Sequence, residues 1–93
     1  MTDFNQIINE NEDIITTYKG RKLILKNMRM YYGPITMQFL PNGGIQSVFD
    51  NKIIINTLNG FMFCDILIYD NIEMSSEEFI EKQGNIVNEV LPN

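Results

Sequence analysis

The sequence lacks histidine and tryptophan altogether and holds a single cysteine, Cys64. Without histidine, neither a Ser-His-Asp nor a Cys-His catalytic arrangement can form, and no zinc site with a histidine ligand can be built. One cysteine excludes an internal disulfide, so the chain fits a reducing compartment. The first residues have neither a basic start nor an apolar stretch, and the longest apolar run, near 61–69, is too short to span a bilayer. We therefore expect a cytoplasmic protein with no cofactor, no metal and no membrane partner.

Two remaining groups are candidates for chemistry. Cys64 falls in the middle of an apolar stretch, where a cysteine usually behaves as a small buried hydrophobe. Asp50 and Lys52 have the spacing of the acid-x-Lys element of restriction-type nucleases, but that site also needs an upstream acidic partner at a strand end. Asp50-Asn51 is an ordinary hairpin turn. The sequence therefore predicts that the protein is not an enzyme.

Composition places the chain among globular proteins. Its 93 residues, of which 44% are hydrophobic, suffice for one domain spanning 1–93. The net charge of −5 opposes a free-standing nucleic-acid binder, which normally presents a surplus of lysine and arginine. Isoleucine and asparagine are abundant whereas alanine is absent. This usage is typical of an AT-rich genome, such as that of a bacterium, a phage or a mobile element.

The hydrophobic periodicity predicts an α+β fold. We expect an antiparallel β-meander of about six strands, which could curl, between a short N-terminal helix over 2–8 and a C-terminal amphipathic helix. The N-terminal helix would be capped by Thr2 and would present Phe4, Ile7 and Ile8 as one apolar stripe. The expected strands are 14–18, 21–32, 35–39, 45–49, 52–58 and 61–69.

The strand over 21–32 contains an irregularity in its alternation. Leu23 and Leu25 share one face, but the same parity would bury Asn27. One extra residue near Asn27 would instead bring Met28, Met30 and Tyr32 onto the Leu23 face. We therefore predict a β-bulge at this point.

The C-terminal helix begins with a capping box, because Ser75 is followed three residues later by Glu78. Gly84 could end the helix early, and Pro92 stops it. We expect the helix to cover the sheet face that carries Val48, Ile53, Ile55 and Ile66, through Phe79, Ile80 and Val87.

Two hairpin turns, Asp50-Asn51 and Asn59-Gly60, set which residues share a sheet face. One face is apolar and must be the core: Val48, Ile53, Ile55, Met62, Cys64, Ile66 and Ile68. The opposite face is also apolar, although Asn56 and Asp65 interrupt it. We predict that it forms an interface centred near Phe63, with a homodimer as the simplest outcome, from Leu58, Phe61, Phe63, Asp65, Leu67 and Tyr69.

Five of the seven basic residues fall within 19–29, next to Tyr31 and Tyr32. A strand that exposes bases and aromatics can contact single-stranded nucleic acid. Here the residues facing outward would be Lys22, Lys26, Arg29 and Tyr31. Charged side chains also protect an edge strand from pairing with other chains, and we expect that explanation to hold.

The function that the sequence favours is a small, acidic, non-enzymatic protein-binding module. One form of this hypothesis is an inhibitor or regulator of a host protein, encoded by a phage or mobile element. A first alternative is a structural or assembly protein that homo-oligomerises through its second apolar sheet face. A second is an accessory protein that contacts nucleic acid through the basic strand, which the net charge makes the weaker hypothesis.

Overall fold

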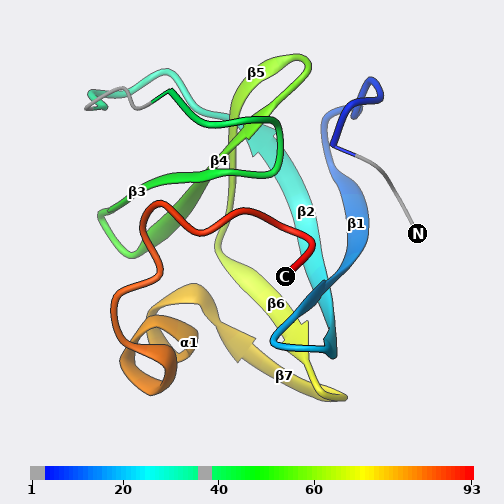
Figure 1. Cartoon of the computed structure of the whole chain (residues 1–93), viewed down its shortest axis with the longest axis vertical. Coiled ribbons are helices and arrows are strands. Elements are labelled where there is room, and N and C mark those ends of the chain that lie inside the picture. Colours follow the sequence, from blue (N-terminus) through cyan, green and yellow to red (C-terminus); the bar gives the residue numbers. More distant parts are fainter. Residues whose placement is uncertain (1–3, 36–38) are drawn as a thin grey trace.

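The computed structural model describes residues 4–35 and 39–93 and is mainly an antiparallel sheet with one helix near the C-terminus (Figure 1). The described residues form seven strands rather than the predicted six. In chain order the elements are β1 (Glu12–Tyr18), β2 (Arg21–Met30), β3 (Ile45–Phe49), β4 (Lys52–Thr57), β5 (Gly60–Cys64), β6 (Ile66–Tyr69), β7 (Ile72–Ser75) and α1 (Ser76–Gln83).

Strand β2 is the centre of the sheet. Its first half pairs with β1 on one side and with β6 on the other, and its last residues pair with β5. The sheet therefore divides into a lower half, formed by β1, β2, β6 and β7, and an upper half, formed by β3, β4, β5 and the end of β2 (Figure 1).

The predicted bulge in β2 is confirmed. Glu12 pairs with Met28 but Ile14 pairs with Leu25, so β2 holds one more residue than β1 between these two pairs. Asn27 has a φ of 55°, a left-handed conformation that asparagine tolerates better than most residues. Its backbone N–H donates to Oδ1 of Asp13 at 2.8 Å. Met28 is buried as predicted, whereas Tyr32 is 87% exposed and lies off that face.

Three two-residue turns have both residues at positive φ, as type I′ hairpin turns require. They are Lys19-Gly20, Asp50-Asn51 and Asp70-Asn71. The third turn, which our prediction missed, joins β6 to β7, a strand that our prediction did not include. The turn between β4 and β5 is shifted by one residue from the prediction, because Thr57 pairs with Gly60 and leaves Leu58-Asn59 as the loop.

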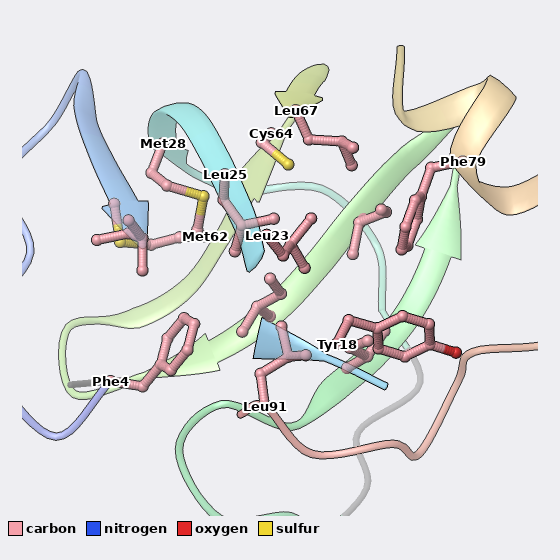
Figure 2. Close-up of a cluster of buried hydrophobic side chains, with 14 of the residues drawn as sticks. Phe4, Tyr18, Leu23, Leu25, Met28, Met62, Cys64, Leu67, Phe79 and Leu91 are labelled. Atoms are coloured by element: carbon pink, nitrogen blue, oxygen red, sulfur yellow. The ribbon is translucent and has the colours of Figure 1, made fainter. Parts of the chain in front are cut away.

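The core lies on the inner side of the curved sheet (Figure 2). Leu23, Leu25 and Met28 of β2 meet Met62 and Cys64 of β5 there, all with 2% exposure or less. Phe79 of α1 closes one end of this core and makes edge-on ring contacts with Tyr18 and Tyr69, at centroid distances of 5.5 and 5.3 Å.

Helix α1 begins where the capping box predicts, with Ser75 Oγ accepting from the Glu78 backbone N–H at 3.1 Å. It ends at Gly84, which has a φ of 79°. The helix packs on the inner face through Phe79 and Ile80, together with Ile53 and Ile55. Val87 lies beyond the helix, and Ile66 faces away from it.

The chain after α1 crosses from the upper half of the sheet to the lower half. The Ile45 N–H donates to the Glu89 carbonyl and the Leu91 N–H to the Gly43 carbonyl, each at 2.8 Å. The Asn93 N–H then donates to the Thr17 carbonyl at 2.9 Å. This segment therefore bridges β3 and β1 across the inner side of the open sheet (Figure 1).

The predicted N-terminal helix is wrong for the residues that the structure describes. Residues 4–9 contain turns and irregular backbone, with Phe4 and Ile8 buried but Ile7 72% exposed. Seven residues are too few for a stable isolated helix. Instead, the Asn59 side chain accepts from the Ile8 N–H at 3.1 Å and donates to the Ile8 carbonyl at 2.9 Å. The proposed Thr2 cap lies outside the described residues.

The strand predicted over 35–39 falls mainly on residues outside the described part of the chain. Ile35 and Phe39, which flank those residues, are not in strands. The predicted strand over 61–69 is two strands, β5 and β6, separated at Asp65.

Candidate functional site

The break at Asp65 reverses which side chains of the following strand face the core. Cys64 points inward, but so does Leu67, three residues later, and both are 0% exposed. Tyr69 also packs against the core. This corrects the sequence-based assignment, in which an unbroken alternation placed Leu67 and Tyr69 on the outer face. Ile66 and Ile68, assigned to the core, lie on the outer face instead.

Of the predicted interface residues, Phe61, Phe63 and Asp65 remain on the outer face of the upper half, and Leu58 lies at the tip of the β4–β5 turn. Phe61, Phe63 and Asp65 are half-buried and Leu58 is 55% exposed. The structure therefore separates the predicted set into core residues, outer-face residues and one turn residue.

Phe63 is covered by side chains of its own chain. The Arg29 guanidinium lies 4.7 Å from the ring centroid and the Lys52 ammonium 5.6 Å from it, both within the range of cation–π attraction. The Tyr31 ring meets Phe63 edge-on at 6.1 Å. Asp65 forms an ion pair with Arg29 and holds the guanidinium over the ring. The side chains of Arg29, Lys52 and Tyr31 thus cover part of the Phe63 ring.

The neighbouring residues of the upper half are covered as well. Ile54, which pairs with Phe63 and shares its face, is 0% exposed. The Asn56 side chain on this face donates to the Leu40 carbonyl at 2.9 Å. Leu40, in the connection that precedes β3, therefore lies beside this part of the upper outer face.

The lower half of the outer face is open and carries a row of isoleucines. Ile15 pairs with Ile24, and Ile24 pairs with Ile68, so the three side chains lie side by side across β1, β2 and β6. Ile66 lies on the same face of β6, two residues before Ile68. Ile15 and Ile66 are 40% and 42% exposed, and the other two are half-buried. We call Ile15, Ile24, Ile66 and Ile68 the isoleucine face.

Nothing in the described part of the chain packs over the isoleucine face. The buried residues of α1, Ser76 and Phe79, point into the core on the other side of the sheet. Polar side chains surround the isoleucines, with Lys22 on β2 and Glu73 on β7, both exposed. Within the described residues, neither has an ion-pair partner.

The residues of the predicted basic strand face outward, but most of their charges are neutralised. Arg21 pairs with Asp70 at 2.6 Å, Lys26 with Asp13 at 2.9 Å, and Arg29 with Asp65. The hydrogen bond from the Asn27 N–H lowers the pKa of Asp13 below its ordinary value, and the hydrogen bond from Lys26 lowers it further. Tyr31 is half-buried, and its hydroxyl donates to the Pro34 carbonyl at 2.6 Å. In the described structure, Lys22 is the one member of this set with neither an acidic partner nor an aromatic one.

The two candidates for chemistry occupy ordinary structural positions. Cys64 is buried, and burial raises the pKa of its thiol to about 12. The Ser76 hydroxyl donates to the Cys64 carbonyl at 2.8 Å. Asp50 and Lys52 form a loose pair at 3.4 Å across an exposed turn. No group of three or more His, Cys, Asp or Glu side chains that could hold a metal ion occurs in 4–35 and 39–93.

A hollow lies between the chain just after β2 and the end of β3, and the described residues that line it are Pro34, Ile35, Ser47, Val48 and Phe49. None of these lining side chains is titratable.

Comparisons with known proteins do not connect this chain to any of them: no protein-family model, no curated protein and no solved structure matches it. Within the described ranges, no helix has both the length and the apolar character needed to cross a membrane.

Sequence reasoning missed the isoleucine face, although two signals pointed to it. Asp65 is a charged residue in the middle of an apolar strand, which is itself a reason to expect a break. Asp70-Asn71 repeats the residue pair of the recognised turn Asp50-Asn51 and marks the start of another hairpin. A register counted backward from Asp70-Asn71 would have placed Ile66 and Ile68 together on a separate face.

Proposed function

We propose that this protein is a small protein-binding module and that its binding surface is the isoleucine face. The observation that supports the proposal is the row Ile15–Ile24–Ile68, which spans three neighbouring strands with no covering element in the described structure. Single exposed apolar residues are common on protein surfaces, whereas contiguous apolar patches are typical of interaction sites. In this proposal the protein acts by occupying a partner's surface, as inhibitors and regulators do.

The charges around this surface favour a protein partner over a nucleic acid. A nucleic-acid site needs several free cations that can displace counterions from phosphates. Three of the bases on β2 are already paired with aspartates of the same chain, and the net charge is −5. The isoleucines are bordered by Lys22 and Glu73 and by the Lys26–Asp13 pair, since Lys26 pairs with Ile66 across β2 and β6. A polar rim of both charges around an apolar centre is the usual anatomy of a protein–protein interface.

Site-specific photo-crosslinking in the source organism tests this proposal. A photoreactive phenylalanine analogue replaces Ile66, on the isoleucine face, or Leu58, which is 55% exposed but lies on the β4–β5 turn. Both positions accept a large side chain because both are open to solvent. We expect discrete adducts of defined mass from position 66 and none of the same mass from position 58.

The masses and properties of the adducts separate the alternatives. A protein adduct at 66 alone supports the proposal, and an adduct of twice the chain mass identifies a second copy as the partner. An adduct that nuclease digestion shortens would instead support the nucleic-acid alternative. Equal labelling at both positions, or no adduct at either, would overturn the isoleucine face as a binding site.

A further inference from the structure

The side chains of the isoleucine face are arranged so that the face complements itself. We propose that the occupant of this face is a second copy of the same chain, related by a twofold axis that lies in the plane between the two sheets. This inference rests on the proposed function, because it assigns the partner for the same surface. It comes from the strand register together with the charges of Lys22 and Glu73.

The register fixes where each outward side chain lies. Neighbouring strands are about 4.8 Å apart, and residues along a strand are spaced about 3.4 Å. The row Ile15–Ile24–Ile68–Glu73 crosses four strands at one level, because each residue pairs with the next. Lys22 lies two residues from Ile24 in one direction along β2. Ile66 lies two residues from Ile68 in the opposite direction along β6.

One symmetry operation matches these positions in pairs. A twofold axis that passes between Ile24 and Ile68, at roughly 35° to the strands, places Lys22 of one copy opposite Glu73 of the other on this spacing. The same axis places Ile15 opposite Ile66, and Ile24 opposite Ile68. The axis was positioned by the charged pair, and on the same spacing it brings Ile15 directly opposite Ile66 and Ile24 to within about 3 Å of the position opposite Ile68.

The charges of this pair favour contact between chains over contact within one chain. On the register, the Lys22 and Glu73 backbones of one chain are roughly 12 Å apart across β2, β6 and β7, and the two side chains form no ion pair with each other. Both are exposed, and neither has an ion-pair partner among the described residues. In a twofold dimer each lysine meets the other copy's glutamate, so two ion pairs form at the rim around an apolar centre.

The size of the molecule sets the expected strength of this contact. Its extents are 28 × 24 × 21 Å, so one flat face offers at most roughly 600 Å² to a partner. Such a dimer buries at most about 1,200 Å² in total, which is the lower limit of specific interfaces. We therefore expect a reversible dimer that forms at tens of micromolar rather than at nanomolar concentration.

Sedimentation equilibrium of the purified chain from about 5 to 500 μM measures this association. We expect the mean mass to rise from one chain toward two across this range. Ile66→Glu should abolish the rise, and Lys22→Glu or Glu73→Lys should each weaken association roughly tenfold or more, since each creates two like-charge contacts. The matched controls are Lys19→Glu and Glu81→Lys, which make the same charge changes at exposed positions away from the face.

Mixing the two single-charge variants gives the decisive measurement. Lys22→Glu and Glu73→Lys alone are each expected to associate roughly tenfold or more weakly than the parent chain, because both charged contacts in either homodimer join like charges. A mixed dimer of the two variants regains opposite charges at both contacts, so the mean mass of the mixture should return to the parent value. A contact within one chain cannot produce this recovery.

The possible outcomes separate this inference from the function on which it rests. A chain that stays monomeric at 500 μM, a dimer that Ile66→Glu leaves intact, or a mixture that does not associate would each overturn the second copy as occupant. If position 66 then crosslinks a different protein, the proposed function still holds. If position 66 captures nothing, both proposals fail. Circular dichroism spectra and melting curves of each variant confirm that it is folded.

Discussion

The Arg29 guanidinium donates to the Asp65 carboxylate across the outer face, at the level where β2 bulges and where β5 ends and β6 begins. On one side of this pair, the outer face is closed by its own residues, with Arg29, Lys52 and Tyr31 around Phe63. On the other side it is open and carries the isoleucine face. The Arg29–Asp65 pair thus marks the boundary between a self-covered surface and one that is free to bind.

The change of face at Asp65 predicts opposite behaviour for two adjacent residues. Leu67→Ala should cost about 2–5 kcal/mol of unfolding free energy, because Leu67 is fully buried. Ile66→Ala should cost less than about 1 kcal/mol, since that side chain is 42% exposed. Urea denaturation of both variants gives the comparison. A larger loss at position 66 than at position 67 would contradict the face assignment.

The bulge predicts a strong preference at position 27, where φ is 55°. Asn27→Gly should stay within about 0.5 kcal/mol of the parent, because glycine adopts this conformation without a steric penalty. Asn27→Ala should cost about 1 kcal/mol, since a Cβ is disfavoured there. Both variants keep the backbone N–H that donates to Asp13. The difference between their unfolding free energies therefore measures the cost of the left-handed backbone conformation for a residue that has a Cβ. Equal stabilities in urea denaturation would count against a left-handed residue at this position.

Phe79 is predicted to be the main attachment of α1 to the core. Its ring is 1% exposed and meets Tyr18 and Tyr69 edge-on. Phe79→Ala should therefore cost about 3–5 kcal/mol, a large part of the stability of a domain this small. Ile80→Ala, one residue along the same helix, should cost less because Ile80 is only partly buried. A melting temperature that Phe79→Ala leaves unchanged would remove this ring from the core.

Burial of Cys64 predicts slow thiol labelling and a loss of stability in alkali. The thiol pKa rises from 9.0 to about 12 in the folded chain, so the native thiol stays protonated at neutral pH. Ellman's reagent should react slowly with the native protein and rapidly in denaturant. Fast native labelling would place the thiol at the surface.

The same shift sets the pH range of the stability change. The unfolded thiol ionises above pH 9 while the folded one does not, so the stabilisation is complete below pH 9 and is lost as the pH rises toward about 12. Burial and Glu89 raise the pKa of Tyr18 too, in the same direction. The unfolding free energy of Cys64→Ala should therefore fall less steeply than that of the parent as the pH rises above 9. If urea denaturation shows the same fall for both proteins, the thiol pKa is not raised.

Features that depend on a few adjacent residues could be predicted from the sequence. The bulge at Asn27 followed from the cost of burying an asparagine between leucines, and its consequence for Met28 is confirmed. The Ser75 cap and the helix end at Gly84 follow from local hydrogen bonding and from glycine's freedom at positive φ. The turn Asp50-Asn51 likewise follows from the tolerance of these residues for left-handed backbone.

Features that depend on pairing between distant segments were decided only by the tertiary structure. Asp65 is a local sign that the strand breaks, but the exchange of faces between β5 and β6 depends on their pairing with β2, a strand more than thirty residues earlier. Residues 4–9 are not helical, and the Asn59 side chain hydrogen-bonds to the Ile8 backbone instead. The chain after α1 lies between β3 and β1. Alternation along one strand indicates which residues share a face only until the strand bends, and where it bends depends on its neighbours. For that reason the sequence alone indicated an apolar outer face, while the fold determined that isoleucines rather than Leu67 and Tyr69 form its open part.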